Sequence, residues 1–237
     1  MSGMYGARPS SRASRTSASV NSRKRTNPWA GGSVIGPFLS VAGGMVRFMR
    51  ELIVTENSTI DGVVELAGDW FSPGDTDPDV DQSDVLATLR EQRENADALL
   101  LGRVTFEDMR GYWPKQTEDT TGISAYLDSV SKYVLSSTLT EPEWENTTVL
   151  SGELRSEIER LKAAEGRDIV TTGSISLVRA LIAEGLVDEY RLFVYPVVIG
   201  EGRRLFEGAT GVPKLRLVEE RPFASGIVLL RYRAASS

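Results

Sequence analysis

Three stretches of the chain place small, hydroxyl-bearing or basic residues directly after an apolar run that resembles a strand. They are Leu99–Thr105, Tyr133–Thr138 and Ile169–Ser174. The first and the third lead directly into helical patterns. In an open α/β sheet, phosphorylated ligands bind at the carboxyl ends of strands and at helix N-termini. Three such strand ends indicate a single extended, phosphorylated ligand, and a dinucleotide is the obvious candidate.

Each stretch offers groups that suit phosphate. A glycine permits close backbone approach, an arginine provides a fork of donors, and a hydroxyl can bond an oxygen or cap a helix. Each stretch also has a plainer interpretation, as a turn with a surface arginine, a capped turn or a helix cap. The candidate cofactor-binding residues are Gly102, Arg103, Val104, Thr105, Ser136, Ser137, Thr172, Gly173, Ser174 and Ile175.

Two further segments carry candidate side chains. Asp61 precedes Gly62 shortly after the first predicted strand. A turn explains this pair, but Asp61 is also the leading carboxylate for orienting a nicotinamide or a substrate, and we take it as the catalytic candidate. Arg203 and Arg204 follow a later strand and either bind an anionic substrate or lie in a solvated loop. Their segment is no G-x-G-x-x-G fingerprint, because Leu205 replaces the third glycine.

Composition excludes several kinds of chemistry. The 237 residues include no cysteine and no histidine, which removes disulfides, thiolate sites, histidine-dependent triads and His-based zinc motifs, so no metal is expected. Eight of the 27 Lys and Arg residues lie within residues 1–50, which hold no acidic residue. The remaining 19 basic and 33 acidic residues give the rest of the chain a net charge of −14. An acidic body disfavours nucleic acid, and no run of about 18 apolar residues predicts a membrane span.

Residues 1–48 are expected to form a disordered, basic, Ser- and Arg-rich extension, and residues 49–235 a single domain. Acid-free, Arg-rich N-termini are typical of transit peptides, and the basic run at residues 23–25 also resembles a secretory signal. Prolines interrupt the apolar stretch after that run. We favour an extension upstream of a start at Met45 or Met49, which predicts a cytoplasmic protein.

Hydrophobic periodicity predicts alternating strands and helices. The predicted strands are Glu51–Thr55, Ala98–Gly102, Lys132–Ser136, Thr147–Leu150, Asp168–Thr172, Glu189–Val198, Lys214–Glu220 and Ile227–Arg233. Helical spacing recurs at residues 80–95, 103–112, 154–165 and 175–184, with Ser174 available as an N-cap. This alternation predicts an α/β fold with a mostly parallel sheet covered on both faces, and Ala224–Gly226 predicts a final antiparallel hairpin.

The order and spacing of several motifs carry a resemblance to a known family. They are Thr59-Ile60-Asp61-Gly62, Ala96 through Glu107, Tyr112-Trp113-Pro114, Val134-Leu135-Ser136-Ser137, Gly173-Ser174, Gly185 through Glu189, and Pro196 through Phe206. With these motifs, residues 50–233 resemble the dihydrofolate-reductase-like family. Within it, they are most similar to the reductase domain of bifunctional riboflavin-biosynthesis deaminase–reductases and its stand-alone relatives.

The resemblance implies a three-layer α/β/α sandwich around a mixed, mostly parallel eight-stranded sheet, NADPH as cofactor, and a homodimer. It implies pyrophosphate binding by Gly102, Arg103 and Thr105 and by the Gly173-Ser174 turn. The 2′-phosphate of the adenosine then falls at Ser136 and Ser137. The chain departs from the family pattern in two respects. Ser174 replaces the second glycine of a Gly-Gly pair, and the substrate-binding acid of the first long helix cannot be chosen among Asp79, Asp81 and Asp84.

Two functions of different classes follow. The first is an NADPH-dependent reductase that transfers hydride to a C=N or C=O bond of a small pteridine-, pyrimidine- or related polar substrate. A riboflavin-pathway reductase proper also needs a site for a ribityl phosphate, for which Arg203 and Arg204 are the evident donors. The second is a nucleotide-binding protein of the same fold without turnover.

Overall fold

The computed structural model describes residues 39–40, 47–65, 70–71, 80–209 and 212–235. Most of the predicted extension, residues 1–38 and 41–46, lies outside the described residues. Two short antiparallel strands, β1 (Leu39–Ser40) and β2 (Arg47–Phe48), fall within residues 1–48, where the composition predicted none.

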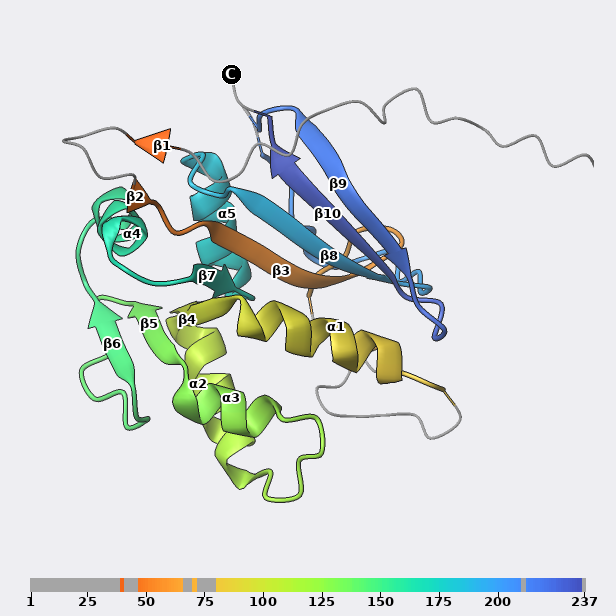
Figure 1. Ribbon diagram of the computed structural model, residues 1–237, viewed down its shortest axis with the longest axis horizontal. Coiled ribbons are helices and arrows are strands. Elements are labelled where there is room, and N and C mark those ends of the chain that lie inside the picture. Colours follow the sequence, from red (N-terminus) through yellow and green to blue (C-terminus); the bar gives the residue numbers. More distant parts are fainter. Residues whose placement is uncertain (1–38, 41–46, 66–69, 72–79, 210–211, 236–237) are drawn as a thin grey trace, which may run out of the picture. The chain divides into compact units, whose positions relative to one another are not determined.

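The other elements form the domain shown in Figure 1. In chain order they are β3 (Leu52–Thr59), α1 (Ser83–Glu94), β4 (Ala96–Gly102), α2 (Arg103–Tyr112), the 3₁₀ turn η1 (Trp113–Lys115), α3 (Ile123–Ser129), β5 (Ser131–Leu135), β6 (Thr147–Leu150), α4 (Leu154–Ala163), β7 (Asp168–Thr171), α5 (Ile175–Ala183), β8 (Glu189–Tyr195), β9 (Leu215–Pro222) and β10 (Val228–Ala234).

One eight-stranded sheet, in the order β6-β5-β4-β7-β3-β8-β10-β9, organises the domain. Every neighbouring pair from β6 to β8 is parallel, whereas β10 runs antiparallel to both β8 and β9. The predicted mixed, mostly parallel sheet is therefore confirmed. Because the parallel strands point the same way, their carboxyl ends share one edge, and the residues that follow them meet there.

Alternation along the strands divides the core into two faces. Ala98 and Leu100 of β4 pack with residues of α4 and α5, whereas Leu99 and Leu101 pack with residues of α2 and α3. Val85 of α1 packs on Phe193 and Leu229, on the same side as α2 and α3. The helices thus cover both faces of the sheet and form the three expected layers (Figure 1).

Two strand ends and one helix differ most from the sequence-based expectations, each for a local reason. Strand β3 continues to Thr59 rather than Thr55, because β8 stays paired with it as far as Tyr195. Strand β8 ends before Pro196, which has no N–H to donate to a ladder. Helix α3 was not predicted, since seven residues are too few to show a helical period.

A buried ion cluster lies at the amino edge of the sheet, opposite the carboxyl edge where the predicted motifs meet. The Glu189 side chain is fully buried and accepts hydrogen bonds from the Nε atoms of Arg191, Arg231 and Arg233 at 2.7, 2.9 and 3.0 Å. Burial alone would raise the pKa of Glu189, but the arginines outweigh it and lower that pKa. The cluster therefore ties β8 to β10 through a permanent negative charge.

Glu189→Gln is expected to lower the free energy of unfolding, because it leaves three guanidinium groups together. Losing one partner of a buried ion pair costs about 3–5 kcal/mol. We expect the lower end, since the Arg231 and Arg233 side chains are 28% and 30% exposed. Urea denaturation measures the loss. Glu91→Gln, at a side chain 62% exposed, is the control, with an expected change within about 0.5 kcal/mol. Equal losses in both variants would contradict the role of the cluster.

Candidate functional site

The sheet order brings the three predicted strand ends together. Strands β5, β4 and β7 are adjacent and parallel. Gly102 is in register with Leu135, so Ser136 follows directly beside the start of α2. The Gly102 N–H donates to the Gly173 carbonyl oxygen at 3.3 Å. Motifs separated by up to 70 residues thus occupy one stretch of the carboxyl edge.

The ends of β4 and β7 approach so closely that a side chain on either glycine would require its neighbour to shift. A Cβ added to Gly102 would lie 2.3 Å from the Ser174 Oγ. Gly173 has a φ of +126°, and a Cβ there would lie 2.9 Å from the Thr105 Oγ1. The peptide bond between Gly173 and Ser174 is cis. The two glycines therefore permit α2 and α5 to begin side by side on opposite faces of the sheet.

Neither of these helices begins with a side-chain cap. Gly102 and Ser174 occupy the N-cap positions of α2 and α5 without capping hydrogen bonds, although the sequence offered Ser174 as a cap. In contrast, Glu153 caps α4 by accepting from the N–H groups of Arg155 and Ser156 at 3.1 and 2.8 Å. First-turn N–H groups without a side-chain acceptor, at the positive end of a helix dipole, suit an anion.

The remaining predicted cofactor residues lie around this edge with contacts of their own. Arg103 pairs with Glu107 at 2.7 Å, and its side chain is 44% exposed. The Ser136 Oγ accepts from the N–H groups of Thr138 and Leu139 at 3.1 and 3.0 Å, so it stabilises the turn after β5. Among the other candidates, the side chains of Val104 and Ser137 are exposed, and those of Thr172 and Ile175 are half-buried. Ligand contacts by these residues stay a prediction.

Asp61 holds two loops together. Its carboxylate accepts from the Thr59 hydroxyl at 2.6 Å and from the N–H groups of Gly200 and Ile199 at 2.8 and 3.3 Å. These hydrogen bonds, that of Thr59 first, lower the pKa of Asp61 to about 2. Asp61 is therefore ionised at neutral pH and cannot donate a proton there. Orientation of a ligand by its charge stays a prediction.

Arg203 and Arg204 are engaged with the same loops. The Arg203 Nε donates to the Glu65 carboxylate at 2.7 Å. The Arg204 Nε donates to the Asp61 carbonyl oxygen at 3.0 Å, and its Nη2 donates to that of Gly200 at 3.2 Å. Their side chains are still 55% and 42% exposed. A substrate role for either arginine stays a prediction, beside this structural role.

The candidate acids of the first long helix bind backbone groups. Asp84, in the first turn of α1, accepts from the N–H groups of Val85 and Ala224 at 2.8 and 2.9 Å. Asp81 accepts from the N–H of Ser83 at 2.9 Å. Asp79 lies outside the described residues. The contacts of Asp81 and Asp84 indicate structural roles.

Sequence reasoning missed an aromatic cluster at the carboxyl edge. Tyr195, the last residue of β8, is in register with Thr59 of β3. Its ring contacts those of Trp70 and Phe71 edge-on, with centroids 5.6 and 5.7 Å apart. Trp70 and Phe71 lie in an irregular segment, where no periodic pattern marks a residue as close to the sheet.

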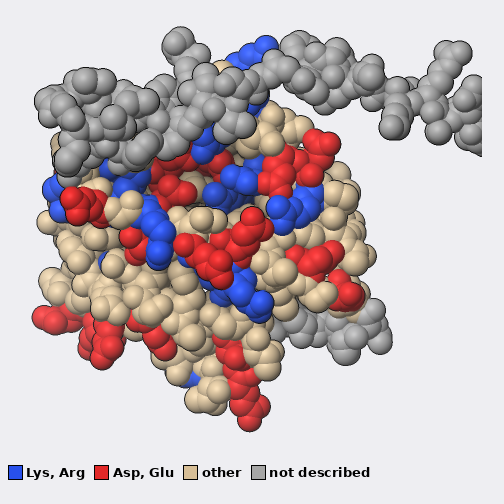
Figure 2. All heavy atoms as spheres, viewed as in Figure 1, with Lys and Arg blue, Asp and Glu red and all other residues tan. Residues whose placement is uncertain are grey.

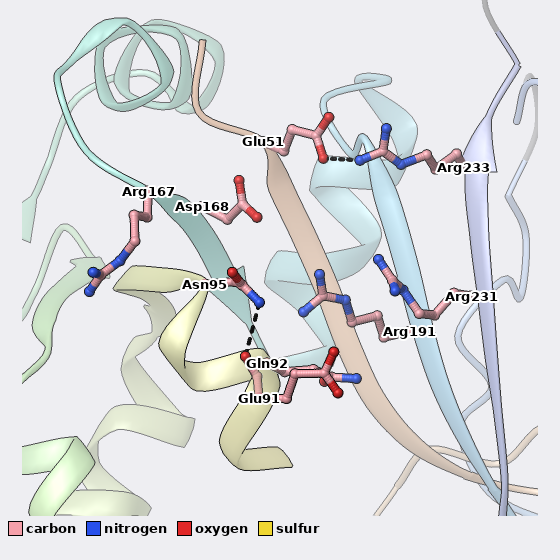
Figure 3. A pocket seen from close by; sticks show the side chains of 9 residues that line it. All are labelled: Glu51, Glu91, Gln92, Asn95, Arg167, Asp168, Arg191, Arg231 and Arg233. Carbon is pink, nitrogen blue, oxygen red and sulfur yellow. Dashed lines mark hydrogen bonds and ion pairs between the residues drawn. The ribbon is translucent and has the colours of Figure 1, made fainter. Parts of the chain in front are cut away.

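A polar cavity of about 320 Å³ opens at the other end of the strands. Figure 3 shows its lining residues, which are Glu51, Glu91, Gln92, Asn95, Arg167, Asp168, Arg191, Arg231 and Arg233. Arg233 pairs with Glu51, and three of these arginines bind Glu189. None of the candidate cofactor or substrate residues lines this cavity, which belongs to the amino edge and its ion cluster.

Comparison with known proteins identifies the family. A family model described as the RibD C-terminal domain matches residues 50–229. The chain belongs to this family. It is 33% identical over 189 residues to the protein YyaP of Bacillus subtilis (strain 168). The aligned region spans 77% of this chain and 94% of YyaP. The predicted resemblance is thus confirmed, and membership of the RibD C-terminal domain family supports an oxidoreductase role.

Solved structures confirm the dihydrofolate-reductase-like fold. A Shewanella sp. PV-4 protein, provisionally assigned to riboflavin biosynthesis, superposes with a TM-score of 0.59 at 21% identity and covers 78% of this chain and 99% of its own. Enterococcus faecalis dihydrofolate reductase, in complex with NADP(H), gives 0.51 at 17% identity, with 78% and 97% covered. Within the described residues, no helix has the length and apolarity to cross a membrane.

Gly102→Ala is expected to separate the ends of β4 and β7, because the new Cβ would lie 2.3 Å from the Ser174 Oγ. Overpacking of this kind costs about 1–3 kcal/mol in the free energy of unfolding. The control is Gly111→Ala within α2, where nothing lies within 4 Å of the new Cβ. Replacing a helical glycine by alanine should stabilise by about 0.5–1 kcal/mol. Urea denaturation compares the two, and a Gly102→Ala protein as stable as wild type would contradict the close approach.

Proposed function

We propose that the protein is an NADPH-dependent reductase of a small, planar, polar substrate such as a pteridine or pyrimidine. The observation that carries this proposal is the meeting of the β5, β4 and β7 ends at two helix N-termini without side-chain caps. Family membership supports it, as does the likeness to a dihydrofolate reductase in complex with NADP(H).

The residues present suit a dinucleotide. Adjacent strands lie about 4.8 Å apart, so the path from β5 past β4 and β7 to β3 spans about 14 Å, which matches an extended dinucleotide. Ser136 and Ser137 would hold the 2′-phosphate, and the starts of α2 and α5 would hold the pyrophosphate. The nicotinamide would then lie at β3, where the bound cofactor supplies a hydride.

The substrate end of this site would be formed by aromatic and charged groups. Tyr195, Trp70 and Phe71 present a ring cluster beside the end of β3, which suits a planar heterocycle. Asp61 would act through its fixed negative charge, and Arg203 and Arg204 would add donors for an anionic substituent. Reduction at such a site depends on positioning and electrostatics, so the absence of histidine is compatible with it.

A small molecule suits this protein better than a nucleic acid. On the face seen in Figure 2, acidic and basic side chains are interspersed over the described residues. Many acidic and basic side chains of the described residues pair locally, as Arg155 does with Glu184 at 3.5 Å. We also keep the homodimer as a proposal, which light scattering in solution tests.

Arg103→Ala is expected to weaken NADPH binding about tenfold or more, because a hydrogen bond from a charged group to phosphate contributes about 1.5–3 kcal/mol. Fluorescence titration measures the dissociation constant. Arg155→Ala is a matched control: this arginine also stands in the first turn of a helix, pairs with a glutamate four residues later and is 47% exposed. Equal affinity of both variants and wild type would contradict phosphate binding by Arg103 and favour the interpretation of residues 102–105 as a simple turn.

NADPH is expected to bind at least tenfold more tightly than NADH, because the cofactors differ only in the 2′-phosphate assigned to Ser136 and Ser137. The same titration compares them. Equal dissociation constants would contradict the assignment of the β5 end. Oxidation of NADPH with a panel of pteridines and pyrimidines separates the reductase from a nucleotide-binding protein without turnover.

A further inference from the structure

Glu56 is a buried acid whose Oε1 atom has no hydrogen-bond partner among the described residues. It lies in the middle of β3, and only 7% of the residue is exposed. Its Oε1 atom is inaccessible to solvent and makes no hydrogen bond, and among the described residues no arginine or lysine pairs with its carboxyl group. Buried polar side chains are nearly always hydrogen-bonded, so an exception requires an explanation.

Glu56 stands where the sheet forks. The last residues that pair β3 with β7 are Val54 and Thr171. After Thr171 the chain turns toward β4, where the Gly173 carbonyl oxygen accepts from the Gly102 N–H. On its other side β3 remains paired with β8, with Glu56 in register with Leu192. Glu56 is therefore two residues beyond the point where β3 loses β7 as a neighbour.

The Glu56 side chain lies on the apolar side of the sheet that α5 covers. Val54 and Leu192 on the same side belong to the core cluster that contains Val178 of α5. Burial in these surroundings raises the pKa of Glu56 to about 8. The group is consequently a neutral acid at pH 7, with one O–H donor and one carbonyl acceptor.

A neutral acid in this place has a cost for folding. The pKa of Glu56 is raised in the folded state, so this state binds the proton more tightly than the unfolded chain does. Stability therefore falls as pH rises from about 4.5 toward 8. A leucine of similar size, like its neighbour Leu192, would avoid that cost. A strongly perturbed group of this kind in a site region indicates a functional role.

We infer that the Glu56 carboxyl group hydrogen-bonds the carboxamide of the nicotinamide and so positions the ring. This inference rests on the proposed function. A dinucleotide with its pyrophosphate at β4 and β7 reaches β3 next in the order of the sheet. A neutral carboxylic acid complements a primary carboxamide, since its O–H donates to the amide oxygen and its carbonyl oxygen accepts from the amide N–H.

The pairing has a predictable pH dependence. Ionisation removes the O–H donor, so NADPH affinity should fall about tenfold from pH 7 to pH 9 in wild type. The other charged or titratable groups on the elements of this face include Glu65, Arg179, Glu184, Tyr190, Arg203, Arg204, Glu207 and Tyr232, together with Arg155, Glu157, Glu159, Arg160 and Lys162 of α4. The pKa of Tyr190 is raised to about 12 and that of Glu65 is lowered, so neither titrates in this range. Arginines keep their charge throughout.

The test compares Glu56→Leu and Glu56→Gln with wild type in titrations against NADPH and adenosine 2′,5′-bisphosphate, which lacks the nicotinamide. Glu56→Leu should bind NADPH at least tenfold more weakly and the bisphosphate unchanged. Glu56→Gln keeps a donor and an acceptor, so it should bind NADPH within about threefold of wild type at pH 7, with no loss at pH 9. Glu51→Gln, the same change at the residue that precedes β3, should alter neither affinity. Melting temperatures show that each variant folds.

The outcomes separate this inference from the proposed function. NADPH binding by Glu56→Leu at wild-type affinity, or an equal loss for both ligands, overturns the role of Glu56 and leaves the proposed function standing. An equal fall of NADPH affinity with pH in wild type and Glu56→Gln also overturns it. Wild-type protein that binds neither ligand overturns the proposed function itself.

Discussion

The close approach of β4 and β7 is the constraint on which the carboxyl edge depends. Gly102 and Ser174 are so close that a Cβ on Gly102 would lie 2.3 Å from the Ser174 Oγ and would require it to shift. Because the two strands are adjacent and parallel, the helices that follow them start at the same point on opposite faces. Their first-turn N–H groups, which lack side-chain caps, therefore converge on one place. Larger residues at the two glycines would separate the helix starts and disperse these donors.

The two edges of the sheet differ in whether their charged and polar groups have partners within the protein. At the amino edge, charges are satisfied within the protein, since Glu189 neutralises arginines of β8 and β10. At the carboxyl edge, the helix starts and the Glu56 carboxyl group have no protein side chain as a partner among the described residues. Such groups cost stability unless something else satisfies them. This asymmetry favours the carboxyl edge as the place of the proposed ligand site, even though a polar cavity opens at the amino edge.

The elements that the sequence predicted are those with strong local patterns. The Leu99–Leu101 run and the Phe106, Met109 and Tyr112 spacing identify β4 and α2 without tertiary information. The candidate phosphate-binding motifs could be found because each places glycine or hydroxyl residues directly after an apolar run. Their convergence followed from the rule that parallel strands share a carboxyl edge. Helix α3 was missed because it is too short to show a period.

The functions of single polar residues could not be predicted in the same way, because their partners are far away in sequence. The sequence predicts Asp61 as a site carboxylate, but it does not reveal that Asp61 also binds backbone groups 138 and 139 residues later. The burial of Glu56 could not be predicted, since a polar residue directly after a predicted strand is expected to face solvent. Strand β8 extends β3 beyond that point and helps to bury Glu56.

The same tertiary pairing that hides Glu56 also explains why it matters. An exposed glutamate at this position would be charged and hydrated, with an ordinary pKa. Burial between β8 and the α5 side of the sheet removes that water, and no basic group replaces it among the described residues. The fold tolerates this neutral acid only while its ionisation lowers the free energy of unfolding by a small amount. A ligand that supplied the missing hydrogen bonds would offset this loss, so the proposed cofactor binding would be coupled to the stability of the central strand.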